Sequence, residues 1–100
     1  MRVHWTNSAE RHLDAIHAHI ALDSPEYARR MVDRLTRRSI QIAEFPHSGR
    51  KVPEYDLDHI REIIEGSFRI IYAIKPDQID VLAVIHAAMD VLGKSEKEDQ

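Results

Sequence analysis

The chain of 100 residues contains no cysteine, which excludes disulfide bonds, thiolate zinc sites and thiol nucleophiles. Glycine and proline are scarce, at 3 and 4 residues, which argues against a fibrous or disordered chain. No apolar run approaches the length of a membrane span, and the amino-terminal segment lacks the hydrophobic region of a secretory signal. We therefore expect one soluble cytoplasmic domain over residues 1–92, followed by a disordered charged tail over residues 93–100.

The chain also lacks a surplus of basic residues. Lys and Arg number 14 against 17 Asp and Glu, which gives a formal net charge of −3. Proteins that bind nucleic acid usually carry a basic excess, because neutralising phosphates supplies most of their affinity. We therefore expect no sequence-specific DNA binding by this chain, whereas a local basic patch for RNA stays open as an alternative.

Two amphipathic helices are predicted in the first half of the chain. A short strand over residues 2–6, rich in β-branched and aromatic types, leads into polar residues 6–8, which offer three alternative N-caps. The helix that follows is expected to end near Ala21, because its apolar residues recur at helical spacing up to that point. Ser24 then precedes a proline that suits a first helical turn, so a second helix is predicted over residues 25–44.

Five arginines share the exposed surface of the second predicted helix. Such a run could form a nucleic-acid face, but it is more often a solvated surface that neighbouring acids partly neutralise. We favour the solvated surface for this set: Arg29, Arg30, Arg34, Arg37 and Arg38.

Three β-rich runs make up the second half, over residues 60–65, 68–74 and 79–86. Gly66 opens a two-residue connection between the first two runs, which favours a type II′ hairpin. The four-residue connection 75–78 is ordinary for a second hairpin. The element order is therefore β-α-α-β-β-β, an α+β fold in which a helical hairpin packs on one face of a small antiparallel sheet.

Pairing Glu65 with Phe68 across the first hairpin divides the strand residues between two faces of the sheet. The mainly apolar set is expected under the helices: Arg61, Ile63, Ile70, Tyr72, Val81, Ala83 and Ile85. The other set combines charges with aliphatic side chains: Glu62, Ile64, Arg69, Ile71, Asp80, Leu82, Val84 and His86. No helix remains to cover this second set. Because contiguous exposed apolar surface tends to mark an interaction site, we expect a partner to bind there.

Two groups of polar residues suggest chemistry at first sight. His12 and His19 lie on one helical face about 10 Å apart by helical rise, too far for one metal ion, and together with His17 they are better explained as surface histidines. Glu62 and Arg69 could act as an acid–base pair, but a diagonal cross-strand ion pair is the favoured interpretation. The chain has no glycine-rich phosphate loop and no nucleophile elbow, so neither a cofactor nor a metal site is expected.

Four strings resemble the ParE branch of the ParE/RelE toxin superfamily: DSPEYARRMVDRL (23–35), FPHSGRKVPEY (45–55), IREIIEGSFRIIYAI (60–74) and DVLAVIHAAMD (80–90). The resemblance implies the fold just described, and a toxin held inactive by a cognate antitoxin, ParD-like or similar, that covers its sheet. The residues expected to bind this partner are Arg61, Glu62, Ile64, Arg69, Ile71, Leu82, Val84 and His86.

The resemblance also divides the possible targets. ParE-like members inhibit DNA gyrase, whereas RelE-like members cleave mRNA in the ribosomal A site, a reaction for which this chain would use Arg61, Arg69 and His86. However, Met89 stands where many relatives carry an arginine, and no tyrosine lies near the end of the sequence. The gyrase hypothesis, with no catalytic residues, is therefore favoured over an mRNA endonuclease or an inactive interaction module.

Overall fold

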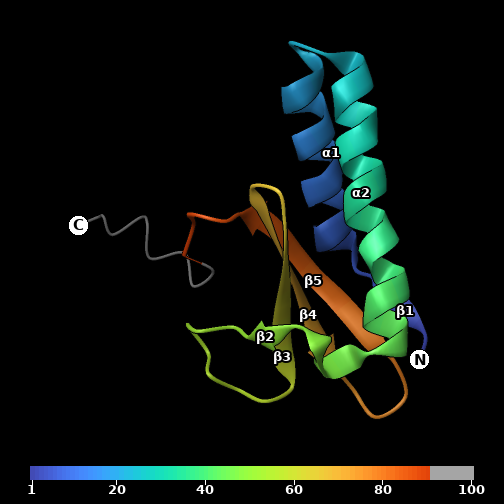
Figure 1. The fold of residues 1–100 in the computed structure, drawn as a ribbon, viewed down its shortest axis with the longest axis vertical. Coiled ribbons are helices and arrows are strands. Elements are labelled where there is room, and N and C mark those ends of the chain that lie inside the picture. The colour runs from blue at the N-terminus through green and yellow to red at the C-terminus, as the bar shows by residue number, and fades with distance from the viewer. Residues whose placement is uncertain (91–100) are drawn as a thin grey trace.

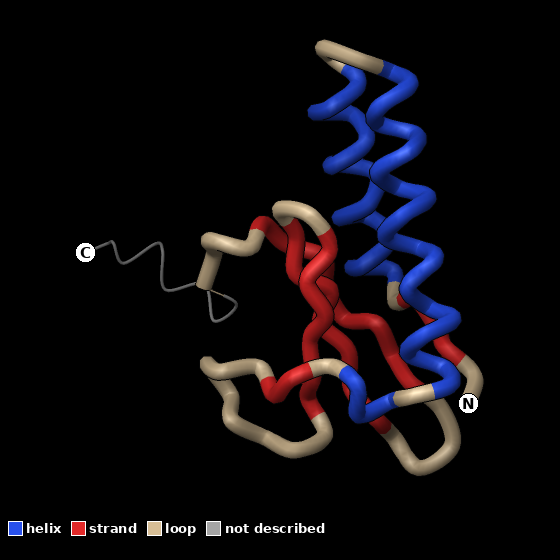
Figure 2. The backbone as a smooth tube through the Cα atoms, in the orientation of Figure 1, coloured by secondary structure: helices blue, strands red, loops and turns tan. Residues whose placement is uncertain are grey.

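The computed structural model, which describes residues 1–90, places two helices against one face of a five-stranded sheet (Figure 1). The elements are β1 (Val3–Trp5), α1 (Asn7–Ala21), α2 (Pro25–Glu44), a short 3-10 helix η1 (Pro46–Ser48), β2 (Arg50–Lys51), β3 (Ile60–Glu65), β4 (Phe68–Ile74) and β5 (Ile79–His86). Figure 2 shows that the helical hairpin projects well beyond the sheet. The predicted tail over residues 93–100 lies outside the described residues.

Side-chain caps fix where both helices begin. The Thr6 hydroxyl accepts a hydrogen bond from the backbone N–H of Ala9 at 3.1 Å, so Thr6 is the N-cap of α1 among the three candidates. Ser24 caps α2 in the same way through the N–H of Tyr27, and Pro25 occupies the first turn, where its missing N–H costs nothing. The predicted ends of both helices are confirmed.

The sheet has the strand order β1-β5-β4-β3-β2. Neighbouring strands are antiparallel except β1, which pairs parallel with β5 through Val3 and Ile79 to Trp5 and Val81. The predicted α+β fold is confirmed, but the sheet is mixed rather than wholly antiparallel. A parallel pair needs a long crossover connection, and here the helical hairpin and three strands lie between its two partners.

The first hairpin has the register expected from its turn. Glu65 pairs with Phe68, Ile63 with Ile70 and Arg61 with Tyr72. Gly66 has a φ of 60°, a left-handed conformation that a type II′ turn requires at its first central position. The prediction for β3 and β4 is therefore confirmed residue by residue.

The register of β5 differs from the prediction because the ladder shifts between Ile71 and Tyr72. Tyr72 pairs with Val81 but Ile71 pairs with Ala83, so the extra residue, Leu82, forms a β-bulge. A one-residue shift moves every later side chain to the other face.

The bulge corrects four placements. Val84 pairs with Ile70, and His86 pairs with Phe68, so both lie on the helix side. Ala83 and Ile85, expected under the helices, lie on the opposite side.

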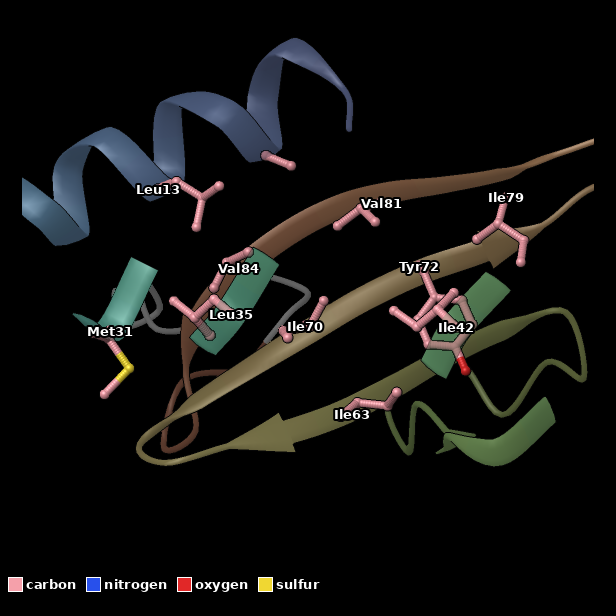
Figure 3. Packing of buried hydrophobic residues seen from close by; sticks show 11 residues of the cluster. Leu13, Met31, Leu35, Ile42, Ile63, Ile70, Tyr72, Ile79, Val81 and Val84 are labelled. Atoms are coloured by element: carbon pink, nitrogen blue, oxygen red, sulfur yellow. The ribbon is translucent and has the colours of Figure 1, made fainter. Parts of the chain in front are cut away.

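The hydrophobic core lies between the helices and the sheet. Leu35 of α2 lies over Val84 and Ile70, while Ile42 lies over Tyr72 (Figure 3). Leu35, Ile42 and Ile70 have no exposed surface. We call this helix-covered side of the sheet the inner face, and the opposite side the outer face.

Candidate functional site on the outer face of the sheet

The centre of the outer face is an arginine that the chain itself surrounds. Arg69 of β4 is only 5% exposed. Its Nε donates a hydrogen bond to Glu62 Oε1 of β3 at 2.7 Å. Its Nη1 and Nη2 atoms reach Glu54 at 2.9 and 2.8 Å, in a two-pronged contact with the segment between β2 and β3. Nη1 also donates to the backbone carbonyl of Met89 at 2.6 Å. One side chain thus joins two strands, a loop and the turn after β5.

Glu62 is the second buried member of this network. Its side chain has no exposed surface, and its two oxygens accept hydrogen bonds from Arg69 and from Arg50 Nε of β2. Buried charges are tolerated only when they are paired and hydrogen-bonded, and both conditions hold here. Hydrogen bonds to Glu54 and then to Glu62 raise the pKa of Arg69 above its usual value, although burial opposes the rise. The predicted cross-strand ion pair between Glu62 and Arg69 is present.

The outer face is therefore less exposed to solvent than the sequence predicts. Ile71 is only 1% exposed, and Asp80 is buried as well. Because Glu54 and Met89 both bind Arg69, the loop after β2 and the turn after β5 are held against this face. The strand pattern predicts a continuous exposed aliphatic surface across the sheet, but the fold covers much of that surface.

A smaller apolar surface surrounds Arg69. Ile64 pairs with Arg69 on one side and Ile85 pairs with it on the other, so the three form one cross-strand row. Ile64 is 44% exposed, Ile85 is half-buried, and Met89 is 48% exposed next to its carbonyl contact. We call Ile64, Ile85 and Met89 the outer patch. It is the part of the outer face on which an apolar partner surface could pack.

Arg61 lies on the other side of the sheet from Arg69. It pairs with the inner-face residue Tyr72, and its guanidinium donates to the carbonyl of Gly49 at 3.0 Å and to Asp58 Oδ1 at 2.7 Å. The hydroxyl of Tyr72 in turn donates to the carbonyl of Pro46 at 2.6 Å and accepts from the N–H of Gly49 at 3.2 Å. Burial raises the pKa of the Tyr72 hydroxyl. These contacts anchor the chain between α2 and β2.

His86 and His12 both make structural contacts at β5. The ring of His86 packs edge-on against Phe68, with 6.0 Å between centroids, and its Nδ1 accepts the N–H of Ala88. His12 of α1 is half-buried, and its Nδ1 accepts the N–H of Val84 at 3.1 Å. His12 is therefore not the surface histidine expected, because β1 covers only the first part of β5 and α1 supplies an acceptor beyond it.

The structure separates most of the residues predicted to form one site. Glu62, Ile64, Arg69 and Ile71 share the outer face, while Arg61, Val84 and His86 belong to the inner side and Leu82 is half-buried at the bulge. Glu54 and Met89 are the participants that the sequence did not indicate. Neither residue lies in a strand, and nothing in the two strings that contain them, 45–55 and 80–90, indicates a contact with Arg69.

Within residues 1–90, no cluster of three or more His, Cys, Asp or Glu side chains has the arrangement to hold a metal ion. In the same range, neither helix is long and apolar enough to cross a membrane.

Comparison with known proteins identifies the family. Residues 3–91 match the family model described as the ParE toxin of the type II toxin–antitoxin system parDE. The chain belongs to the ParE toxin family. A protein of Sinorhizobium fredii (strain NBRC 101917 / NGR234), named "Putative toxin Y4kP", is 36% identical over 88 residues, which cover 86% of this ParE-family chain and 88% of the relative.

Two solved structures share the fold of this ParE-family toxin. One is a chromosomal ParDE system from P. aeruginosa, with a TM-score of 0.71 and 24% identity over 86% of this chain and 95% of that one. The other is the RelBE2 toxin–antitoxin complex from Mycobacterium tuberculosis, with a TM-score of 0.63 and 18% identity over 85% and 95% of the two chains. At these identities the likeness concerns the fold.

Proposed function

We propose that this ParE-family toxin acts by inhibiting DNA gyrase, and that a cognate antitoxin neutralises it by covering the outer patch. The toxin needs no catalytic residues of its own in this proposal, because gyrase performs the strand chemistry and the toxin only binds and traps a state. Family membership supports the first half of the proposal. The four hydrogen bonds that Arg69 donates within the chain are the observation that supports it over RNA cleavage.

An arginine that stabilises a phosphate during RNA cleavage must have free N–H donors aimed at the substrate. Arg69 instead directs its donors at two carboxylates and a carbonyl, at 2.6 to 2.9 Å. Redirecting Arg69 to a phosphate would take from the fully buried Glu62 one of its two arginine partners, which is costly because a buried charge depends on its pairing. Arg69 is therefore better suited to holding the fold together than to binding RNA.

The other two residues of the nuclease hypothesis are also poorly arranged for it. Arg61 lies on the inner side of the sheet, bound to Gly49 and Asp58, whereas Arg69 lies on the outer side. His86 pairs with the inner-face residue Phe68. General acid–base catalysis needs its groups within hydrogen-bond reach of the same proton. Three groups divided between two faces do not meet that condition.

The outer patch supports the proposed antitoxin site. Ile64 and Met89 expose apolar surface beside a rigid ionic network, and an interface gains most from apolar side chains around a well-ordered centre. Both solved neighbours are described as toxin–antitoxin systems, which agrees with a protein partner for this fold.

The decisive experiment is a supercoiling assay with purified gyrase, relaxed plasmid and the full-length toxin, with and without a molar excess of the antitoxin. We expect loss of supercoiling that the antitoxin reverses. In parallel, induced cells should show a DNA-damage response before amino-acid incorporation falls. Immediate arrest of translation, with mRNA cut at codons in the ribosomal A site and gyrase unaffected, would reject the proposal and favour the endonuclease.

A further inference from the structure

A groove of about 400 Å³ runs along the side of α2, away from the outer face. Three consecutive turns of the helix contribute to it, and Glu65 at the end of β3 forms part of its wall. The side chains that line it are three basic, two acidic and three uncharged ones: Arg34, Arg37, Arg38, Glu44, Glu65, Ile40, Gln41 and Phe45.

The charges in this groove are unequally paired. Arg34 and Arg38 each donate to a different oxygen of Glu65 at 2.8 Å, so one carboxylate serves two guanidinium groups. Arg37 makes no hydrogen bond or ion pair with any residue in the described range 1–90. The helix as a whole has five arginines against three acidic residues, although the chain is net negative at −3. Positive charge is thus concentrated on α2 and left partly unneutralised in the groove.

Apolar surface lies directly beside that charge. Ile40 and Phe45 are each 62% exposed, more than any other large apolar residue in the described range except Leu22 at the tip of the helical hairpin. Phe45 also borders a second hollow of about 490 Å³, formed with Pro46, His47 and Ser48. The two hollows therefore form one continuous surface with an exposed aromatic ring between them.

We propose that this groove is a second protein-binding surface, and that it takes an acidic segment of the toxin's target that also carries apolar side chains. A carboxylate of that segment would pair with Arg37, and its apolar side chains would pack against Ile40 and Phe45. Charge complementarity identifies the chemistry of the occupant, because the three guanidinium groups of the groove outnumber its two carboxylates, Glu44 and Glu65.

The assignment to the target rests on the function proposed above, which requires two protein partners. The outer patch accounts for the antitoxin, and Ile64, Ile85 and Met89 lie on the opposite side of the sheet from α2. A partner seated on the outer patch therefore leaves the groove free for a second protein.

A matched pair of charge reversals tests the groove. Arg37→Glu places a repulsive charge inside it, while Arg29→Glu makes the same change on an exposed part of the same helix outside it. Ile40→Ser removes an apolar contact without disturbing the core, because Ile40 is mostly exposed. Each full-length variant is first shown to have the same denaturation midpoint as the parent. It is then assayed for growth arrest on induction, for inhibition of gyrase supercoiling, and for antitoxin affinity by titration calorimetry.

We expect Arg37→Glu to weaken gyrase inhibition about tenfold or more and to relieve growth arrest, as expected for loss of a charge-assisted contact at an interface. Ile40→Ser should have a smaller effect in the same direction. Arg29→Glu should behave as the parent, and all three variants should bind the antitoxin within about twofold of the parent affinity.

Two results would overturn the inference. If Arg37→Glu and Ile40→Ser arrest growth as strongly as Arg29→Glu, the groove binds no target. If Arg37→Glu loses antitoxin affinity instead, the occupant is the antitoxin. Should the parent protein fail to inhibit gyrase at all, the proposed function fails, but the comparison of growth arrest between Arg37→Glu and Arg29→Glu still decides whether the groove matters.

Discussion

The two faces of the sheet bury their side chains by different physical means, although the same three strands build both. The inner face buries apolar residues such as Ile70 and Leu35, and this burial is favourable in any orientation that fills the space. The outer face buries Glu62 and Arg69, which are tolerated only because their hydrogen bonds have particular partners at particular distances. Substitutions on the inner face should therefore destabilise the fold when they change the volume of a side chain. Substitutions on the outer face should do so when they remove a hydrogen-bonding partner.

Removing the centre of the outer network should have the largest effect on stability. Arg69→Ala would remove one of the two arginine partners of the buried Glu62 and the two-pronged contact with Glu54, and breaking a buried ion pair in this way costs about 3–5 kcal/mol. The measurement is the free energy of unfolding from urea denaturation. Arg37→Ala, which removes an exposed arginine, is the control and should change it by less than about 0.5 kcal/mol. Equal losses in the two variants would mean that the outer network contributes nothing to the fold.

Creating a cavity between α2 and the inner face tests that face by the same measurement, the free energy of unfolding. Leu35 of α2 is fully buried against the inner face, so Leu35→Ala should cost about 2–5 kcal/mol, which combines lost transfer energy with an unfilled cavity. Leu22→Ala, at a residue that is 83% exposed, is the control with the same change of side chain. The loss at Leu35 should persist at high salt. A salt-dependent loss there would contradict the distinction between the faces.

The hydroxyl of Tyr72 makes two hydrogen bonds on the mainly apolar inner side of the sheet. Tyr72→Phe would leave the carbonyl of Pro46 and the N–H of Gly49 without this partner, at a cost of about 1–3 kcal/mol. Hydrogen exchange should accelerate at Gly49 while remaining slow at Ile70. Tyr27→Phe, which changes a partly exposed tyrosine, should leave both rates unaltered.

The smallest predicted effect concerns Glu65, which joins β3 to α2. Burial by itself raises the pKa of this carboxyl, but hydrogen bonds from Arg34 and Arg38 outweigh burial and hold the pKa below its ordinary value of 4.5. The contacts of Glu65 with the two arginines therefore stabilise the fold above pH 4.5. This contribution is lost as the pH falls through the lower folded-state pKa of Glu65. Glu65→Gln should cost at most about 1 kcal/mol at pH 7 and less at low pH.

Much of the fold could be predicted because its signals are local. Ser24 followed by a proline fixes the start of α2, and Gly66 fixes the register of the first hairpin through its turn. The bulge at Leu82 could not be predicted, because it depends on how β5 meets β1 and α1 rather than on its own sequence. That single extra residue reversed the expected faces of Val84 and His86.

The candidate site was less predictable than the fold. The outer-face positions of Ile64 and Arg69 follow from strand alternation, so the pattern was sufficient for them. Glu54 reaches Arg69 from an irregular loop 15 residues earlier, and Met89 does so through a backbone carbonyl that any residue could supply. Contacts of this kind depend on the complete tertiary structure, and no periodicity encodes them.

The parallel pairing of β1 with β5 has a consequence for synthesis of the toxin. Val3 is made 76 residues before its strand partner Ile79. A nascent chain can form α1 and α2 early, since their contacts are local, but β1 has no strand to join until β5 emerges. The sheet therefore cannot close until β5 has emerged, and a truncated product that lacks β5 should leave β1 without a strand partner.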